Sequence, residues 1–349
     1  MSAIEQYGIF LLQVITIVIA LIAILAFITS KAQAAKQKAE KGSLLVTKIN
    51  DDFDNLTDTM NLAMLDKDQQ KAELKKIKAH QKIERKEKKQ KNLKETTKRK
   101  RLFVIDFHGD IRASAVESLK AEVNAILLTA TMNDEVLIRL ESGGGMVNAY
   151  GLAASQLHRI RTAKIPLTIA IDKVAASGGY MMACVGNHII SAPFAIIGSI
   201  GVLAQIPNFH QWLKHHHIDF EQITAGEYKR TMTLFGENDS KGRKKMQEDI
   251  NETHTLFKNF IHENRAMVDL DKVANGEYWY GSQAIHLKLV DALQTSDDYL
   301  LKAAHNCDIY QIEFRHKLPA IKRFFQKADS ALLKWRTTSH HVDEKYFLG

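Results

Sequence analysis

Two glycine-rich turns contain the residues whose types and spacing are best suited to chemistry in this sequence. The first turn is Ser142-Gly-Gly-Gly145, and the second is Ala175-Ala-Ser-Gly-Gly179. Ser177 stands immediately before two glycines, so we expect its hydroxyl to lie beside unpaired backbone N–H groups at the start of a helix. A serine nucleophile needs such donors, because they stabilise the oxyanion that forms on attack. A serine that only completes a tight turn gives the same pattern.

A serine nucleophile also needs a base that takes its proton. The spacing around Ser177 is close to that of a nucleophile elbow, which would require an aspartate and a histidine further along the chain. The sequence has 15 histidines, but none is singled out by its neighbours, and His215-His-His217 lies in a polar stretch. Lys229, beside Gly226 and Tyr228, lies in a segment typical of a strand end or loop. A lysine kept uncharged by burial can act as the base, but spacing alone does not select Lys229 among the lysines.

Alternating strand-like and helix-like segments position these two turns. Strands are expected at residues 102–107, 135–140 and 166–171, and helices at 115–129, 146–160, 180–185 and 236–265. Short apolar strands that alternate with helices of this length predict an α/β domain with mainly parallel pairing. Both glycine turns then follow a strand and precede a helix, which is where such folds place ligands and chemistry.

An apolar segment lies near the N-terminus, at residues 8–28. Its only clear polar interruptions are Gln13 and Thr16, and its length is sufficient to cross a hydrocarbon layer of about 30 Å. We expect a transmembrane helix that anchors the protein in the lipid bilayer. A cleaved signal peptide is the alternative, since Ala32-Gln-Ala34 resembles a cleavage site, but the run is long and no Lys or Arg precedes it. Lysines follow the segment, which favours a cytoplasmic location for the downstream chain.

The positive charge of the chain is concentrated in one segment. The protein has 349 residues and a formal net charge of +8, and residues 71–101 alone contain 15 Lys or Arg against 4 Asp or Glu. Residues 31–101 contain no proline and one glycine, so their composition predicts a helical, basic spacer. Residues 71–101 have no aromatic side chain for base stacking, and we expect no nucleic-acid partner. The two cysteines, Cys184 and Cys307, are not spaced as a thiolate zinc site.

Four segments, taken in order, resemble the signal peptide peptidase A family of serine peptidases. They are Leu140–Val147, Val174–Tyr180, Gly198–Val202 and Gly226–Lys229. The layout is similar to that of the family's inner-membrane SohB branch, which has one catalytic domain behind an N-terminal anchor and a basic spacer. The resemblance covers residues 102–292, and the ordered set is far more specific than any single motif.

The resemblance implies a ClpP/crotonase-like fold and hydrolysis of peptide bonds by a serine/lysine dyad. Ser177 matches the family's nucleophile, and Lys229 matches its general base. The backbone amides of Gly145 and Gly178 match the oxyanion hole. We expect no cofactor and no bound metal.

Two positions depart from the family's pattern. Gly143 stands where the first turn usually has a proline, and the change loosens a turn that should hold an oxyanion donor still. Lys288 replaces a common glycine. Neither change removes a catalytic group.

These features together predict the organisation of the protein and its partners. The predicted regions are a transmembrane anchor at 8–28, a helical basic spacer at 31–101, a serine peptidase domain at 102–316 and a basic amphipathic tail at 317–349. The family implies a homo-oligomer in which neighbouring subunits complete each dyad, and a peptide or protein as substrate. The expected location is the bacterial inner membrane, with the side of the catalytic domain left open.

Two other functions are compatible with the residues. A crotonase-type acyl-CoA enzyme can use two backbone donors of the same fold to hold a thioester oxyanion, and it predicts that Ser177 and Lys229 are dispensable. A non-catalytic membrane scaffold that binds partners through its spacer predicts that deletion of residues 71–101 abolishes function. That scaffold predicts no loss of function on mutation of Ser177.

Overall fold

The computed structural model describes residues 12, 16, 42–75, 79 and 99–315. Residues 45–313 form one compact unit, and the described residues 42–44 and 314–315 belong to a second one. The predicted anchor at 8–28 lies outside the described residues except for Leu12 and Thr16, and the predicted tail at 317–349 lies wholly outside them. In the part of the chain that is described, no helix is long and apolar enough to cross a membrane.

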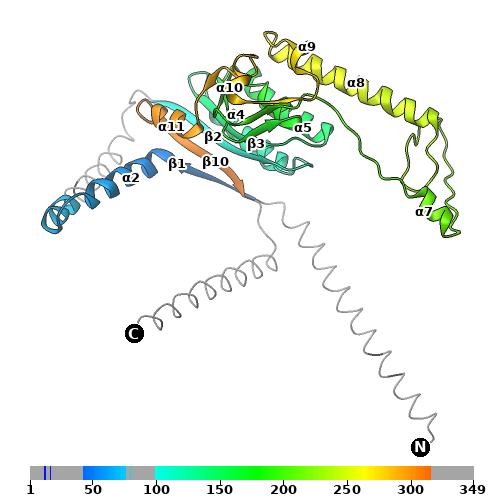
Figure 1. The fold of residues 1–349 in the computed structure, drawn as a ribbon. Coiled ribbons are helices and arrows are strands. Elements are labelled where there is room, and N and C mark those ends of the chain that lie inside the picture. The colour runs from blue at the N-terminus through cyan, green and yellow to red at the C-terminus, as the bar shows by residue number, and fades with distance from the viewer. Residues whose placement is uncertain (1–11, 13–15, 17–41, 76–78, 80–98, 316–349) are drawn as a thin grey trace, which may run out of the picture. The chain divides into compact units, whose positions relative to one another are not determined.

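Ten strands form one sheet within the described ranges (Figure 1). The main path of the sheet is β1-β10-β2-β3-β4-β6-β9, and the pairings from β10 to β9 are parallel. From β3 a branch continues through β5 and β7 to the antiparallel strand β8. The strands are β1 (Ser43–Lys48), β2 (Lys100–Gly109), β3 (Glu135–Ser142), β4 (Leu167–Ile171), β5 (Val174–Ala176), β6 (His188–Ser191), β7 (Ile196–Gly198), β8 (Tyr278–Tyr280), β9 (Ala292–Leu293) and β10 (Cys307–Arg315).

Helices cover both faces of the sheet. The helices are α2 (Ile49–Ala63), α4 (Val116–Thr129), α5 (Val147–Thr162), α6 (Gly178–Ala183), α7 (His210–His215), α8 (Ser240–Asn264), α9 (Leu270–Val273), α10 (Gly281–Ala284) and α11 (Ser296–Ala304). In the larger core, Ile105 of β2 belongs to the same cluster as Leu119 of α4 and Leu157 of α5. The smaller core contains Val104 together with Leu300 of α11. Since successive side chains of a strand point to opposite faces, the two cores lie on opposite sides of the sheet.

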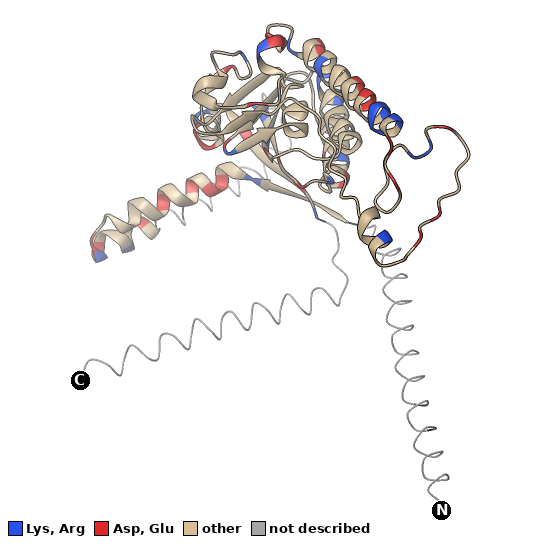
Figure 2. Ribbon diagram, turned by 45° about the vertical axis from the view of Figure 1, so that its right-hand side comes forward, with Lys and Arg blue, Asp and Glu red and all other residues tan. Residues whose placement is uncertain are grey.

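The predicted α/β fold with mainly parallel strands is confirmed. The helix expected at 115–129 is α4, and the strand expected at 135–140 lies within β3. Residues 43–48 differ from the prediction of a helical spacer, because they form strand β1 beside β10. Their sequence, Ser-Leu-Leu-Val-Thr-Lys, contains residues that favour a strand once a neighbouring edge is available. Figure 2 shows that charged residues are frequent on the helices α2 and α8 and sparse on the sheet.

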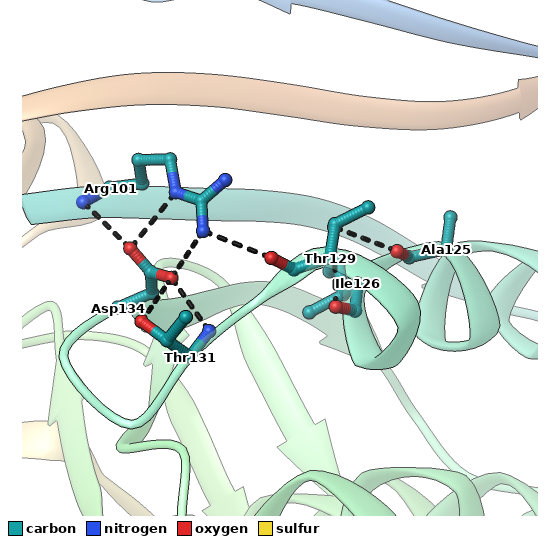
Figure 3. Close-up of polar contacts among 6 residues, drawn as sticks. All are labelled: Arg101, Ala125, Ile126, Thr129, Thr131 and Asp134. Carbon is teal, nitrogen blue, oxygen red and sulfur yellow. Dashed lines mark hydrogen bonds and ion pairs between the residues drawn. The ribbon is translucent and has the colours of Figure 1, made fainter. Parts of the chain in front are cut away.

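A buried carboxylate connects the start of β2 to the loop between α4 and β3 (Figure 3). The guanidinium of Arg101 donates to Asp134 from Nε at 3.0 Å and from Nη2 at 2.6 Å. Thr131 donates to the same carboxylate from its backbone N at 2.7 Å and from its hydroxyl at 2.9 Å. Burial by itself would raise the pKa of Asp134, but the hydrogen bonds from Arg101 and Thr131 outweigh it and lower the pKa to about 2. The carboxylate is therefore more stable as an anion in the folded chain than in the unfolded one.

We expect the Asp134→Asn variant to lose about 2 kcal/mol of unfolding free energy near pH 6 and much less at pH 2. The folded-state pKa of about 2 lies below the ordinary value of 3.8. The stabilisation is therefore fully present above the unfolded-state pKa and is lost as the pH falls through the folded-state pKa. Urea titrations of the full chain in detergent, from pH 6 to pH 2, measure the difference between the variant and the wild type.

The exposed pair of Glu117 and Lys120, at 3.0 Å, supplies the control for this titration. The Glu117→Gln variant is expected to differ from the wild type by less than about 0.5 kcal/mol throughout the pH range, because exposed ion pairs contribute little. If the unfolding free energy of Asp134→Asn lies below that of the wild type by the same amount from pH 6 to pH 2, the stabilisation does not come from the ionised carboxylate.

A second ion pair ties the residue after α8 to the residue before the closing strand β9. Arg265 is almost fully buried, and it donates to Asp291 at 2.8 Å and to the carbonyl of Lys288 at 2.8 Å. Asp291 also accepts a hydrogen bond from the backbone N of Ile189 in β6. Lys288 has a φ of +60°, in the left-handed region that favours glycine. This conformation gives a physical reason for the glycine that is common at this position in the family.

Candidate active site

The two glycine turns lie against each other where β3 and β5 end. Ser142, the last residue of β3, is paired with Ala175 of β5. Gly144 has a φ of +88°, and a Cβ atom at this position would lie 2.7 Å from the backbone N of Gly178 and 2.8 Å from Cβ of Ser177. No other residue fits there without displacing the second turn. The backbone of the first turn therefore touches the serine of the second turn.

Ser177 has a backbone conformation that serine rarely adopts, with φ at 52° and ψ at −118°. Its backbone N donates to the carbonyl of Gly198 at 2.7 Å, and its carbonyl accepts from the backbone N of Met181 at 3.0 Å. The residue is half-buried, and its Oγ makes no hydrogen bond with any residue that the structure describes. Strained residues persist only where the surrounding structure holds them, and they concentrate at functional sites. The geometry is that of an available hydroxyl on a rigid turn.

The two residues that were expected in the oxyanion hole also belong to these turns. Gly145 lies just before α5, and a Cβ atom on it would collide with the carbonyl of Ile111. Gly178 is the first residue of α6, and its Cβ would lie 2.5 Å from Cγ of Tyr150. The first N–H groups of a helix have no acceptor within the helix, so this region is rich in available donors. Both glycines are therefore closely packed, Gly178 beside Ser177 in the chain and Gly145 beside Gly144.

The structure does not bring Lys229 to this cluster. The residue is exposed in the segment 201–239, whose only helix is α7, and its backbone N donates to the carbonyl of Gly226 at 3.1 Å. Figure 1 shows this segment leaving the sheet, reaching α7 and returning to α8. We call residues 201–239 the arm. Its loops enclose a cleft of about 690 Å³ that is lined by Lys229 and by apolar side chains including Phe220 and Leu234.

The chemistry of the remaining candidate groups is limited. His215, His216 and His217 are exposed at the end of α7, and the stacking of Trp212 on His216 accounts for part of their arrangement. Among the residues that the structure describes, no group of three or more His, Cys, Asp or Glu side chains could hold a metal ion. Ser177 is thus the residue around which the site can be built.

Sequence reasoning missed Tyr150, which contacts both glycine turns. Tyr150 of α5 is fully buried, and its hydroxyl lies 2.5 Å from Oγ of Ser142 and donates to the carbonyl of Asp110 at 2.7 Å. Ser142 in turn accepts a hydrogen bond from the backbone N of Gly144 at 3.1 Å. The only sequence signal is that Tyr150 is the single Phe, Trp or Tyr of the helix after the first turn. That signal by itself indicates nothing more than core packing.

Comparisons with known proteins identify the family of this chain. The family models for the peptidase family S49 N-terminal region and for peptidase family S49 match residues 2–157 and 159–309. The Probable protease SohB of Haemophilus influenzae is 46% identical over 331 residues, which cover 94% of this chain and 93% of the relative. The Probable protease SohB of Buchnera aphidicola subsp. Acyrthosiphon pisum is 53% identical over 226 residues, 65% of this chain and 67% of the relative.

A search of solved structures gives a weaker likeness. A chain described as 1510-N membrane-bound stomatin-specific protease, a point mutant in complex with a substrate peptide, has a TM-score of 0.36 and 15% sequence identity. The match covers 65% of this chain and 95% of that chain. The sequence comparisons are much stronger, and they confirm the family expected from the four motifs. On those comparisons, the chain belongs to peptidase family S49.

Proposed function

We propose that this protein is a serine endopeptidase of the inner membrane, with a ClpP/crotonase-like catalytic domain behind an anchor at residues 8–28. The observation that carries the proposal is the strained conformation of Ser177, which lies against Gly144 and whose Oγ has no hydrogen-bond partner among the residues that the structure describes. Membership of peptidase family S49 supports peptide-bond hydrolysis as the reaction. The substrate class is a peptide or a membrane-associated protein.

In the proposed mechanism, Oγ of Ser177 attacks the carbonyl carbon of the scissile peptide bond. The uncharged amine of Lys229 takes the hydroxyl proton, and the backbone amides of Gly145 and Gly178 donate hydrogen bonds to the oxyanion that forms. Lys229 then gives the proton to the leaving amine, which departs and leaves an acyl ester on Ser177. Water, deprotonated by Lys229, attacks the ester, and Lys229 then gives this proton to Oγ of Ser177 as the second product leaves with a new carboxyl group.

The position of Lys229 supports assembly into a homo-oligomer in which the lysine serves the serine of a neighbouring subunit. The arm exposes several large apolar side chains, and Leu203, Trp212 and Ile223 are 77%, 57% and 97% exposed. An exposed apolar surface of this kind is typical of a protein–protein interface. Burial in such an interface favours the uncharged form of a lysine, which the mechanism requires.

Covalent labelling tests the assignment of Ser177. A fluorophosphonate probe is expected to bond to Oγ of Ser177 in the detergent-solubilised full chain and to abolish casein hydrolysis in proportion to the labelled fraction. Mass spectrometry of the digested protein locates the probe. The matched control is Ser155→Ala, which removes an exposed serine of α5 and should leave both labelling and hydrolysis unchanged.

The labelling experiment also separates the proposed function from its alternatives. Labelling and hydrolysis that persist in the Ser177→Ala protein would rule out Ser177 as the nucleophile. Coenzyme A binding by a wild-type protein that neither labels nor cleaves casein would favour the acyl-CoA enzyme. Loss of function only on deletion of residues 71–101 would favour the scaffold.

A further inference from the structure

A chain of hydrogen bonds runs from the first glycine turn into the core. It consists of the backbone N of Gly144, Oγ of Ser142, the hydroxyl of Tyr150 and the carbonyl of Asp110, with successive separations of 3.1, 2.5 and 2.7 Å. Ser142 and Tyr150 are both buried, with exposed fractions of 1% and 0%. Water therefore cannot replace these partners without rearrangement of the core.

The donors and acceptors of this chain can be assigned from its chemistry. The carbonyl of Asp110 can only accept, so the Tyr150 hydroxyl donates its single proton to this carbonyl. Ser142 must then donate its own proton to the oxygen of Tyr150. The lone pairs of the Ser142 oxygen remain free to accept from the N–H of Gly144. Each hydroxyl donates once and accepts once, so the chain is fully satisfied.

Both ends of this chain are attached to well-defined backbone. The carboxylate of Asp110 accepts hydrogen bonds from the backbone N of Arg112 at 3.1 Å and of Ser114 at 2.8 Å, which closes the loop after β2. The backbone N of Met146 donates to the carbonyl of Ile111 in the same loop at 2.8 Å. The loop after β2 is therefore a fixed support for the start of α5.

Tyr150 touches both glycine turns in different ways. Its hydroxyl reaches the first turn through Ser142 and Gly144, whereas its ring lies against Gly178 in the second turn. A Cβ atom on Gly178 would lie 2.5 Å from Cγ and 2.9 Å from Cβ of Tyr150. One buried side chain thus contacts the residues on either side of the proposed oxyanion site.

We infer that Tyr150, acting through Ser142, is a positioning residue that sets the distance between the oxyanion donors Gly145 and Gly178. This inference rests on the proposed role of Ser177 as the nucleophile. The first turn contains three consecutive glycines, Gly143 to Gly145, so its backbone has few steric restrictions of its own. The hydrogen bond from the backbone N of Gly144 to Ser142 restricts the backbone of this turn.

The chemistry of Tyr150 is compatible with this purely mechanical role. Burial raises the pKa of its hydroxyl above the ordinary value for tyrosine, so the side chain is protonated near neutral pH and can donate. No step of the proposed reaction passes through the phenol. Its removal should therefore affect the stabilisation of the transition state and leave the binding of substrate nearly unchanged.

The Tyr150→Phe variant tests the inference, because it removes one oxygen and keeps the ring against Gly178. With fluorescent casein and the detergent-solubilised full chain, we expect kcat to fall by about 10- to 100-fold while KM stays within about twofold. The rate of fluorophosphonate labelling at Ser177 should fall by a similar factor, since the phosphonyl oxygen occupies the same site. Ser142→Ala breaks the next link and should reproduce the same loss.

Tyr180 provides a matched control for loss of a buried hydroxyl. It is also fully buried, and its hydroxyl donates to the carbonyl of Leu289 at 3.0 Å and not to a residue of either glycine turn. Tyr180→Phe is expected to lower the urea midpoint of unfolding about as much as Tyr150→Phe does, with kcat kept within about twofold of the wild type. A kcat for Tyr150→Phe that equals the value for Tyr180→Phe would overturn the inference.

The double variant Tyr150→Phe, Ser142→Ala decides whether the two hydroxyls act as one chain. Its kcat should be no more than about twofold below that of either single variant, because each substitution already breaks the chain. Losses that multiply in the double variant would show two independent effects and would contradict the inference. Hydrolysis and labelling that persist in Ser177→Ala would contradict the proposed function. A kcat of Tyr150→Phe that equals that of Tyr180→Phe would contradict only the role of Tyr150, so the two failures can be distinguished.

Discussion

A mixture of the Ser177→Ala and Lys229→Ala proteins is expected to recover the peptide hydrolysis that neither protein has alone. Each single substitution removes one member of the proposed dyad and should lower kcat by roughly 10⁴-fold or more. In the folded chain, Lys229 is exposed in the arm and lies apart from Ser177. A lysine that serves the neighbouring subunit can therefore meet an intact serine only in a mixed oligomer.

The fraction of hydrolytic activity that the mixture recovers can also be predicted. If subunits mix at random, a site is intact when an intact serine meets an intact lysine from its neighbour, which occurs for about a quarter of the sites. The two proteins are combined in dissociating detergent and reassembled, and casein hydrolysis is measured as the mixing ratio is varied. Activity should be greatest near equal amounts, because both kinds of subunit are needed at each intact site.

The control for the mixing experiment is Lys214→Ala, a substitution of another exposed lysine in the arm. This protein should keep nearly wild-type hydrolysis, which shows that loss of a charge in the arm is not the cause of inactivity. A mixture that stays as inactive as its components, although the two proteins co-assemble, would place Ser177 and Lys229 of one subunit in the same site. Full activity of Lys229→Ala alone would require a different base.

A methyl group added at Gly144 is expected to abolish activity, whereas the same change at Gly143 is expected to be harmless. The Cβ of Gly144→Ala would enter the space taken by Ser177 and Gly178, and its φ of +88° is unfavourable for alanine. The oxyanion donors and the nucleophile would move apart, so we expect kcat/KM for casein to fall at least about 100-fold. Labelling of Ser177 by the fluorophosphonate should slow in parallel.

The neighbouring position supplies the control for this prediction. A Cβ on Gly143 would meet no atom within 4 Å, and the φ of this glycine lies outside the left-handed region. Gly143→Ala should therefore keep kcat/KM within about twofold and raise the unfolding free energy by about 0.5 kcal/mol, because alanine restricts the unfolded chain more than glycine does. Equal rates for the two variants would mean that contact between the turns has no part in catalysis.

Comparison of the sequence analysis with the structure shows which features local patterns determine. The spacing of apolar residues in α4 and the apolar runs of β3 and β4 are local signals, and each of these elements forms where it was expected. Strand β1 was not expected, because its pairing with β10 joins distant parts of the chain, and because lysines precede it and aspartates follow it. Local composition gives no information about a pairing strand that is distant in the chain.

The sequence by itself determined the family, the α/β fold and the residues proposed for the dyad, because the four motifs are short and ordered along the chain. Only the tertiary structure decided how these residues are placed. It put Gly144 against Ser177, connected Tyr150 to the first turn and left Lys229 exposed in the arm. These placements depend on contacts between segments that are distant in sequence, and the chain order of the motifs carries no information about such distances.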